Sequence, residues 1–534
     1  MSNDAVRTRS TIEKGRTALG IELGSTRIKA VLIGPDHQPL AVGGHHWENQ
    51  YVDRRWTYSL DAVWDGVHEA YAALAGDVSS RYGVELTTVG ALGISAMMHG
   101  YLALNADGEL LTPFRTWRNT STDQAAEQLS EHFGYNIPHR WSVAHLYQAL
   151  LDGEEHVERV THLTTLAGYV HWRLTGELIL GIGDASGMFP IDVATGGYDA
   201  RLLDQFDALA ADRGLQTPLA DLLPTIRTAG EPGGVLTAHG AQLLDPTGTL
   251  AAGAPLCPPE GDAGTGMVAT NSVAPRSGNV SAGTSIFAMV VLEHPLSQVH
   301  RELDLVTTPA GDLVAMVHCN NGASELNTWA NLFAELVTAL GLDVDKATVF
   351  ETLVRSALDG DPDAGGLTAY NYLSGEPITE LAEGRPLFLR SPDSSLTLAN
   401  FVRSQLYAAL ATLRIGMDVL QKDEGVRLDT MFAHGGLFTT KGVAQRFLAA
   451  AIDTPVAVGD TASEGGAWGI AVLAAFHATR SDGQRLEDFL AHQVFADSPL
   501  DTVVPDPSDA AGFEAFLTRF RAALPVERAA VEHA

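Results

Sequence analysis

A pattern that occurs twice in the chain limits the fold more than any other feature of the sequence. In each copy, apolar side chains alternate with other residues on both sides of a glycine and two hydroxyl residues. The alternation predicts paired β-strands, and the small residues between them predict a tight turn. Two hairpins of one design indicate a duplicated architecture, although a repeat this short is equally compatible with two unrelated hairpins. The turn residues are Gly24, Ser25 and Thr26 in the first copy and Gly283, Thr284 and Ser285 in the second.

Strand and helix patterns alternate through the rest of the chain. Glycines stand at the ends of several predicted strands, which is typical of layered α/β domains that bind ligands at their strand ends. A stretch rich in glycine and proline from 229 to 266 predicts the main domain boundary. We therefore expect domains over 17–265 and 266–480, followed by a helical extension over 481–534. Helices are predicted over 60–74, 326–340, 402–420, 443–452 and 464–476, and strands over 89–96 and 428–433.

Length, charge and cysteine content exclude several classes of protein. The 534 residues are enough for at least two domains at a usual size of about 150 residues each. The formal net charge of −31 opposes binding to nucleic acid or to an anionic membrane surface. Two distant cysteines, Cys257 and Cys319, support neither a disulfide framework nor a structural zinc site. Because we find no signal sequence and no apolar run of roughly 18 residues, we expect a soluble cytoplasmic protein.

The motifs of several common enzyme classes are missing. The chain has no P-loop, no zinc-protease helix, no serine-hydrolase elbow and no dinucleotide loop between a strand and a helix. What remains is a set of glycine turns, whose backbone N–H groups can approach an anion closely while hydroxyl groups add uncharged donors. Two such hairpins could grip the phosphates of a nucleotide, and Gly435 with Gly436 could admit a base or a phosphate near a helix start. Each turn taken alone is more simply explained as a structural turn.

Several ordered stretches resemble the FGGY family of carbohydrate kinases, over essentially residues 17–480. The order and spacing of these stretches are specific to the family. The resemblance implies an α/β fold of two actin-like (ribonuclease-H-like) domains with an interdomain cleft for ATP and sugar. It also implies ATP and Mg²⁺ as cofactors, and transfer of the γ-phosphoryl group to a hydroxyl of a sugar or polyol. The stretches are 20–26 with 29–30, 98–100, 174–177 with 184–186, 261–263, 283–285, 372–376, 435–436 and 464–469.

The same resemblance assigns roles to individual residues. Asp262 matches the catalytic base, which must lie within hydrogen-bond reach of the attacking sugar hydroxyl. Met98 and His99 match positions that contact the sugar. Glu22 replaces an aspartate that faces the Mg²⁺–phosphate group, so we expect Glu22 at the metal. The resemblance further implies phosphate binding by Gly24, Ser25, Thr26, Gly283, Thr284 and Ser285, and adenosine binding by Gly435 and Gly436.

Each of these acidic and histidine positions also has a structural explanation. Asp262 could stabilise the glycine loop as an Asx turn. Glu22 could be a carboxylate on the solvated face of a strand, although a strand carboxylate without a partner is costly to bury. A lone histidine such as His99 is more often a satisfied structural group than a ligand contact.

The chain also departs from the family pattern in three places. Trp117, Arg118 and Asn119 stand where family members often carry Trp-x-Asp-x-Arg, which puts the sugar contacts in question. Ala263 after the expected base resembles ribulose kinases, because xylulose kinases usually carry asparagine there. Leu437 replaces the third glycine of the adenosine turn.

We therefore predict an ATP-dependent kinase of a small ketose, with a ketopentose such as ribulose or xylulose as the favoured substrate. The alternatives are a kinase for another polyol or a ketohexose, a catalytically inactive sugar- or nucleotide-binding regulator of the same fold, and an actin-like ATPase. A small-molecule sugar is the expected partner, with no nucleic acid and no membrane, and a homodimer is an allowed assembly. The stereochemistry of the sugar is not encoded locally, because side chains from several loops contact its hydroxyl groups.

Overall fold

The computed structural model describes residues 3–459, 465–498 and 500–533. Residue Glu464, with which one predicted helix and one family-like stretch begin, lies outside the described residues. The chain forms two compact units. The first unit comprises Met1–Val273, Leu305–Val314 and Thr461–Asp497, and the second comprises Ala274–Asp304, Ala315–Asp460 and Ser498–Ala534. Unlike the contiguous domains expected from the sequence, both units are therefore built from separate segments of the chain.

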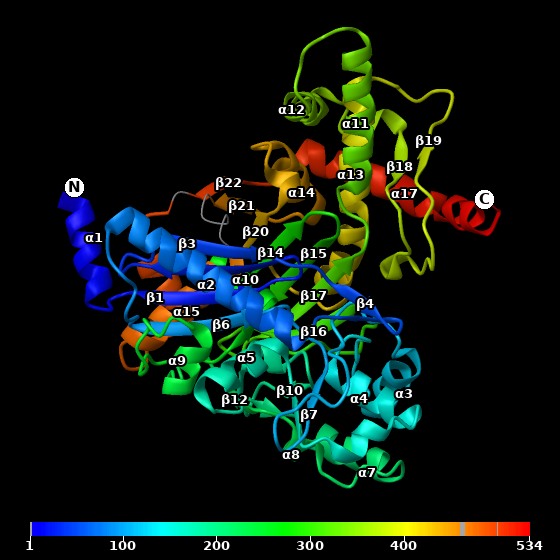
Figure 1. Cartoon of the computed structure of the whole chain (residues 1–534). Helices are drawn as coiled ribbons and strands as arrows, with labels where there is room; N and C mark the ends of the chain where they lie inside the picture. The colour runs from blue at the N-terminus through cyan, green and yellow to red at the C-terminus, as the bar shows by residue number, and fades with distance from the viewer. Residues whose placement is uncertain (1–2, 460–464, 499, 534) are drawn as a thin grey trace. The chain divides into compact units, whose positions relative to one another are not determined.

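The first unit is organised around a five-stranded sheet in the order β13-β6-β1-β2-β3 (Figure 1). β1 (Ala18–Leu23) pairs antiparallel with β2 (Arg27–Ile33) and parallel with β6 (Ala91–Ala96). β3 (Pro39–His46) lies at one edge, and β13 (Glu260–Gly261) lies at the other, parallel to β6. The alternating apolar side chains of the first hairpin account for this core, because Leu19, Ile21 and Leu23 are fully buried.

Helices α2 and α15 pack on this sheet. α2 (Leu60–Tyr82) contacts β2 and β3, and it extends further than the predicted 60–74. α15 (Gly465–Thr479) contacts β1, β6 and α10 (Asp262–Ala269). Its small residues allow a close approach, since a Cβ at Gly20 would lie 2.1 Å from the carbonyl oxygen of Ala467. This packing is the physical reason why a segment late in the chain belongs to the first unit.

The other elements of the first unit surround this core. The helices are α1 (Asn3–Glu13), α3 (Asp123–Phe133), α4 (Ser142–Leu151), α5 (Leu166–Thr175), α6 (Ile182–Ala185), α7 (Ala200–Ala211), α8 (Leu219–Leu222), α9 (Ala238–Leu244) and α16 (Leu486–Phe489). The short strands are β4 (Gln50–Val52), β5 (Arg55–Thr57), β7 (Leu102–Leu104), β8 (His162–Thr164), β9 (Ile179–Gly181), β10 (Ile191–Asp192), β11 (Gly197–Tyr198) and β12 (Thr225–Arg227).

The second unit is organised around a seven-stranded sheet in the order β16-β17-β15-β14-β20-β21-β22 (Figure 1). β14 (Ser277–Ala282) pairs antiparallel with β15 (Ile286–Val291) and parallel with β20 (Thr430–His434). β20 in turn pairs parallel with β21 (Val456–Gly459). The remaining elements are β16 (Leu303–Thr307), β17 (Leu313–Cys319), β18 (Thr368–Tyr370), β19 (Leu387–Leu389), β22 (Leu500–Val503), α11 (Ser324–Ala339), α12 (Lys346–Ser356), α13 (Leu398–Asp418), α14 (Val443–Ile452) and α17 (Pro507–His533).

The two sheets repeat one arrangement of strands. The order β13-β6-β1-β2-β3 in the first matches β21-β20-β14-β15-β17 in the second. In each, the hairpin is antiparallel and its first strand pairs parallel with the next strand along the order. The duplicated architecture predicted from the two hairpins is therefore confirmed.

The C-terminal region contributes directly to the two units. β22 pairs antiparallel with β21 and so extends the second sheet by one strand. α17 contacts α14, α13 and β18 through buried aromatic residues, which include Phe513, Phe516 and Phe520. The segment Ser498–Ala534 is thus assigned to the second unit, to whose core these aromatic residues contribute, whereas residues 481–497 belong to the first. No helix within the described ranges is both long and apolar enough to span a membrane.

Candidate functional site

The expected base, Asp262, is the first residue of α10 and directly follows β13. Its Oδ1 accepts a hydrogen bond of 3.0 Å from the backbone N–H of Met98. Burial raises the pKa of the Asp262 carboxyl above its ordinary value, against the lowering effect of the N–H groups of Met98 and Ala263. The structure therefore joins the expected base to the segment expected to contact the sugar, although the two lie 164 residues apart in the chain.

Glu22 lies on β1, with Lys29 of β2 and Ser95 of β6 as its strand partners. Its Oε2 accepts a hydrogen bond of 3.2 Å from the N–H of Ala467 in α15. Burial and the negative charge of Asp262 raise the pKa of Glu22 to about 7, while Lys29 and the Ala467 N–H oppose the rise. Glu22 is thus partly buried and electrostatically coupled to Asp262, unlike a solvated strand carboxylate.

The close approach of α15 leaves no room for a side chain beside Glu22. A Cβ at Gly466 would lie 2.4 Å from Glu22 Oε1 and 2.7 Å from Thr265 Oγ1. Gly466, in the family-like stretch 464–469, therefore lies directly against the carboxylate of Glu22. This role of Gly466 depends on residues far apart in sequence and was not predicted.

The oxygen donors of Glu22 and Asp262 fit a divalent cation that keeps part of its hydration. Mg²⁺ is usually bound by one or two carboxylates together with water and substrate phosphates, so a complete protein cage is not required. Among the residues that the structure describes, no group of three His, Cys, Asp or Glu side chains could hold a metal on its own. Two carboxylates that repel each other provide the donors, and a cation would relieve the repulsion that raises the pKa of Glu22.

Asp184 is a buried acid in this unit that sequence reasoning gave no role. It lies in α6, and its Oδ2 accepts a hydrogen bond of 2.6 Å from Thr165 Oγ1. Its Oδ1 is buried with no hydrogen-bond partner in the described part of the chain, and a Cβ at Gly261 would lie 3.1 Å from it. Burial and the charge of Asp262 raise the pKa of Asp184 to about 7, against the effect of Thr165. Its place in the Asp-Ala-Ser stretch was the signal that could have identified it.

Glu260 adds another buried carboxyl next to the expected base. Its oxygens accept hydrogen bonds from the backbone N–H groups of Gly183, at 3.2 Å, and of Asp184, at 2.9 Å. Burial and the charge of Asp184 raise its pKa to about 8, although these N–H groups oppose the rise. Because its carboxyl holds the start of α6, Glu260 positions Asp184 and connects β13 to that helix.

His99 has an unusual backbone conformation and a buried ring, neither of which was predicted from the sequence. It adopts the left-handed conformation, with φ of 70°, and its buried ring contacts the carbonyl oxygen of Gly187 through Nδ1 at 3.3 Å. Burial, together with the charge of Arg140, holds the pKa of His99 well below its ordinary value, so the ring is neutral near pH 7. A Cβ at Gly187 would lie 2.5 Å from this nitrogen. The sugar contact predicted for His99 stays a prediction.

The first hairpin turn, residues 24–26, is held by aromatic side chains. Trp47 Nε1 donates to the carbonyl oxygen of the first turn residue at 2.7 Å, and the Tyr58 hydroxyl donates to the Ser25 carbonyl at 2.5 Å. Trp117 Nε1 donates to Ser25 Oγ at 3.1 Å. The rings of Trp47 and Tyr58 stack with centroids 4.1 Å apart. The contacts of Trp47 and Tyr58 with this turn were not predicted, because no motif in their own segments indicates them.

The departure at residues 117–119 has a structural explanation. Asn119 donates from Nδ2 to the carbonyl oxygens of Trp56, at 2.8 Å, and Thr116, at 3.0 Å. Its Oδ1 accepts from the N–H of Trp56 at 2.9 Å. Arg118 lies over the ring of Trp56 at 4.4 Å. The side-chain amide of Asn119 thus holds the backbone of Trp56 and Thr116 in place, which gives this residue a structural role.

The second hairpin turn, residues 283–285, is held by backbone groups. The N–H of Gly322 donates to the Thr284 carbonyl at 2.7 Å, and the N–H of Ala323 donates to the Gly283 carbonyl at 2.8 Å. A Cβ at Gly322 would lie 2.5 Å from the Gly283 carbonyl oxygen, so only glycine fits there. Ser285 closes the turn by accepting a 2.9 Å hydrogen bond from the N–H of Gly283.

A buried side-chain network supports the loop that braces this turn. Asn321 Oδ1 accepts from the N–H groups of Leu373, at 2.9 Å, and Ser374, at 3.0 Å. Its Nδ2 donates to Glu376 Oε2 at 3.0 Å. Burial raises the pKa of Glu376 to about 7, against the lowering effect of its hydrogen bonds with Asn321. The family-like stretch 372–376 therefore acts on the second hairpin through Asn321.

The expected adenosine turn lies beside the second hairpin. Gly435 has φ of 104°, and a Cβ on it would lie 2.4 Å from the carbonyl oxygen of Ala282, the last residue of β14. Gly436 begins a short 3₁₀ helix, Gly436–Phe438. Leu437, which replaces a third glycine, is buried in the core. The second unit thus brings two predicted nucleotide-binding turns together.

Comparisons with known proteins agree with the duplicated fold. The N-terminal domain model of the FGGY family of carbohydrate kinases matches residues 17–254, and its C-terminal domain model matches residues 278–478. A xylulose kinase of Haemophilus influenzae is 23% identical over 346 residues, which cover 62% of this chain and 64% of the relative. The chain thus spans somewhat less than two thirds of that protein's length.

Solved structures share the fold at low sequence identity. A xyloylose kinase from Brucella ovis superposes with a TM-score of 0.77 and 20% identity, covering 96% of this chain and 99% of the other. A gluconate kinase from Lactobacillus acidophilus superposes with a TM-score of 0.76 and 18% identity, covering 96% and 98%. Together, the two domain matches and the repeated strand order confirm the predicted fold class. The chain belongs to the FGGY family of carbohydrate kinases.

Proposed function

We propose that the protein is an ATP-dependent kinase that phosphorylates the terminal hydroxyl of a small ketose, with a ketopentose such as xylulose or ribulose as substrate. The observation that carries this proposal is the position of Asp262. It stands at the start of a helix, bonded to Met98 of the expected sugar segment and electrostatically coupled to Glu22. Xylulose kinases among the relatives support a pentulose, while a gluconate kinase of the same fold makes a sugar acid the alternative to test.

The geometry around Asp262 suits general-base catalysis. A carboxylate at a helix start is stabilised by the positive end of the helix dipole, so it stays available as an acceptor despite burial. Burial raises its pKa towards neutrality, which strengthens it as a base for the hydroxyl proton. Asp262 would orient the terminal hydroxyl for in-line attack and accept its proton as the bond to phosphorus forms.

The proposed cofactors are ATP and Mg²⁺. Glu22 would hold the cation or its bound water, and a divalent ion in this position neutralises charge on the transferring phosphoryl group. The turn at 283–285 and Gly435 with Gly436 would bind the nucleotide, because small residues let backbone N–H groups approach phosphates closely. The turn at 24–26 follows the strand that carries Glu22 and would bind phosphate in the same way.

Replacement of the base tests this proposal directly. Asp262→Asn is expected to lower kcat by about 10²–10⁴-fold, the usual contribution of a positioned general base. Nucleotide affinity, measured by calorimetric titration with ADP, should change little. Asp107→Asn, at an exposed loop position of the same unit, is the matched control and should retain full activity. Undiminished turnover in Asp262→Asn would contradict the mechanism.

The alternative with a specific observation behind it is a regulator that binds sugar or nucleotide without catalysis. Glu22 favours it, because the longer side chain stands where the family pattern has an aspartate. A panel of ketoses, polyols and sugar acids with coupled detection of ADP separates the candidates. Sugar-dependent ADP release supports the kinase, and sugar-independent release indicates an ATPase. Melting shifts with sugar but without ADP release indicate the regulator.

A further inference from the structure

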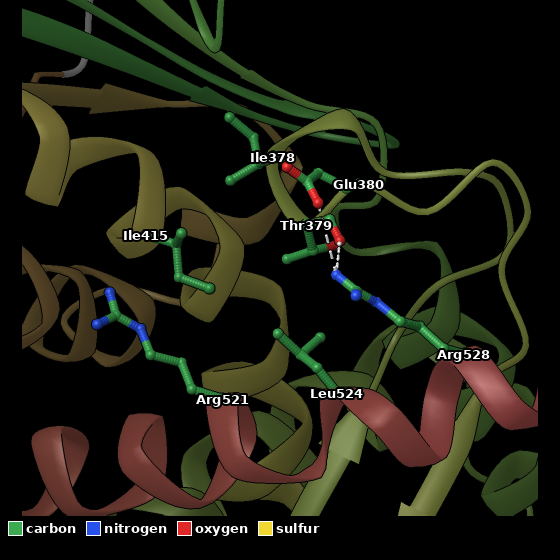
Figure 2. A pocket seen from close by; sticks show the side chains of 7 residues that line it. All are labelled: Ile378, Thr379, Glu380, Ile415, Arg521, Leu524 and Arg528. Atoms are coloured by element: carbon green, nitrogen blue, oxygen red, sulfur yellow. Dashed lines mark hydrogen bonds and ion pairs between the residues drawn. The ribbon is translucent and has the colours of Figure 1, made fainter. Parts of the chain in front are cut away.

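The second unit contains a cavity of about 240 Å³ whose lining residues include none of the predicted nucleotide-binding turns (Figure 2). It opens between the short 3₁₀ helix Pro377–Thr379, α13 and the C-terminal helix α17. Figure 2 shows Arg528 of α17 pointing towards Thr379, whereas Arg521 of the same helix points away from it. The lining residues are Ile378, Thr379, Glu380, Ile415, Arg521, Leu524 and Arg528.

The charged lining of this cavity is mainly cationic, in a chain whose net charge is −31. Arg521 pairs with Asp418 at 2.6 Å, but Asp418 is shared with Arg414, at 2.8 Å, and Lys422, at 3.0 Å. Three cations therefore contact one carboxylate, and their charge is not balanced by it. Local excess of positive charge in an acidic protein attracts anions to this cavity.

Arg528, the other arginine of the lining, is held only by weak contacts. Its Nη2 donates to the Thr379 carbonyl at 3.2 Å and lies 3.8 Å from a carboxylate oxygen of Glu380. The Glu380 side chain is 86% exposed, so this ion pair is weak and the carboxylate can leave it at little cost. A guanidinium so placed can exchange its partner for an anion, which it can bind through two parallel N–H donors.

The apolar lining limits the kind of anion. Ile378, Ile415 and Leu524 provide hydrocarbon surface next to the two guanidinium groups. The volume of about 240 Å³ is below the range of roughly 300–1,000 Å³ typical of sites for drug-sized ligands. The cavity therefore suits a small organic anion with a short carbon skeleton.

We propose that this cavity is a binding site for a small organic anion, a carboxylate or a phosphate monoester. Arg528 binds the charged group, Arg521 adds positive charge to the lining, and the carbon skeleton packs on Ile415 and Leu524. The site is built entirely from residues of the second unit. None of its lining residues is a carboxylate of the first unit proposed for phosphoryl transfer.

Hydrogen bonds and short stretches of chain link this cavity to the turn at 283–285. The N–H of Thr379 donates to the Glu376 carbonyl at 3.1 Å, and Thr379 Oγ1 donates to the Tyr372 hydroxyl at 3.2 Å. Glu376 holds Asn321, whose neighbour Gly322 braces the turn. An anion that takes Arg528 from the Thr379 carbonyl therefore acts on the first of these links. The resulting change in nucleotide affinity rests on the proposed function.

Binding is tested by calorimetric titration of the full chain at low ionic strength. The probes are glycerol 3-phosphate, malate and, as the uncharged control, glycerol. Saturable binding of either anion is expected, weakened at least tenfold by Arg528→Gln and by Leu524→Glu, which places a carboxylate in the cavity. Arg390→Gln, at an exposed arginine of the same unit, is the control and should bind as the unmodified chain does. The two anions distinguish a phosphate-ester ligand from a carboxylate.

Either of two results would overturn the site: no saturable binding of either anion, or equal affinity in all variants. The effect on the turn is measured separately, by titration with ADP in the presence and absence of the bound anion. At least a threefold change in ADP affinity is expected in the unmodified chain and none in Arg528→Gln. Constant ADP affinity would overturn the link to the turn. Neither titration requires turnover, so failure of the proposed kinase activity is distinguished from failure of the site.

Discussion

The two units share one strand order but stabilise their hairpins and place their acidic residues differently. In the first unit, the turn at 24–26 is fixed by the side chains of Trp47, Tyr58 and Trp117. In the second, the turn at 283–285 is fixed by backbone N–H groups of the loop at 322–323. In the first unit, acids with raised pKa values, Glu22, Asp184 and Glu260, gather around Asp262. In the second unit, the acid with a raised pKa near the turn is Glu376, and it is hydrogen-bonded to Asn321. The two units thus share one arrangement of strands but differ at the strand ends. The first carries a cluster of acidic side chains there, and the second holds its turn with backbone N–H groups.

The largest effect expected from this difference is on the pH dependence of stability. The pKa of Asp184 is raised to about 7, so its contribution to stability is complete below its ordinary pKa and is lost as pH rises through about 7. Asp184→Asn removes a buried group that must otherwise ionise, which should increase the free energy of unfolding at pH 8 by up to about 4 kcal/mol. Denaturant unfolding of both proteins at pH 5 and pH 8 measures this change in the free energy of unfolding.

The control for this prediction is Asp107→Asn, because Asp107 is exposed. The difference between pH 5 and pH 8 should persist in that variant and shrink in Asp184→Asn. An unchanged pH dependence in Asp184→Asn would show that the acids of the first unit are already compensated, and the contrast between the units would lose its electrostatic basis.

The second effect concerns the metal. Glu22→Gln keeps the shape of the side chain but removes the charge coupled to Asp262, so the Mg²⁺ concentration for half-maximal activity should rise about 10–100-fold, as for residues that support a metal indirectly. ADP affinity in the absence of Mg²⁺ should not change, because the substitution leaves the backbone of the phosphate-binding and adenosine-binding turns unaltered. Equal Mg²⁺ requirements in Glu22→Gln and the unmodified chain would show that Glu22 does not take part in metal binding.

A smaller effect is expected from the backbone-braced turn. Asn321→Ala leaves the N–H groups of Leu373 and Ser374 without their acceptor, and each lost buried partner costs about 1–3 kcal/mol. Because the loop at 322–323 then loosens, ADP should bind about tenfold more weakly, equivalent to about 1.4 kcal/mol. The exposed neighbour Asn320, whose side-chain Nδ2 donates to the Gly375 carbonyl at 2.8 Å, is the control, since Asn320→Ala should change ADP affinity less. Unchanged ADP affinity in Asn321→Ala would show that the turn at 283–285 keeps its conformation without support from Asn321.

The smallest effect is expected at the rim of the first turn. Trp117→Phe removes one exposed hydrogen bond to Ser25 Oγ, worth about 0.5 kcal/mol at the lower end of the usual range, and leaves the buried contacts of Trp47 and Tyr58 in place. The KM for ATP should rise no more than about threefold. A much larger change would mean that Trp117 contacts a ligand directly. Trp329→Phe, in the second unit, is the control because Trp329 packs on Phe401.

Much of the fold and part of the site were predictable from the sequence. The repeated hairpins, the buried strand β6 and the helices α13 and α14 follow from local periodicity, and the structure confirms them. Asp262 and Glu22 were identified through their motifs, and the structure brings the two together. The return of residues 461–497 to the first unit was not predicted, because the packing of α15 depends on glycines whose neighbours lie hundreds of residues away.

By itself, the sequence determined the elements, the duplication and the family, because each depends on residue types close together in the chain. Only the tertiary structure decided how the acids interact. Glu22 meets Ala467 across 445 residues, Asp262 meets Met98 across 164, and Glu260 holds Asp184 across 76. Burial and charge repulsion raise their pKa values only after these segments come together. Desolvation is a property of the packed molecule, so no local pattern of residues can encode it.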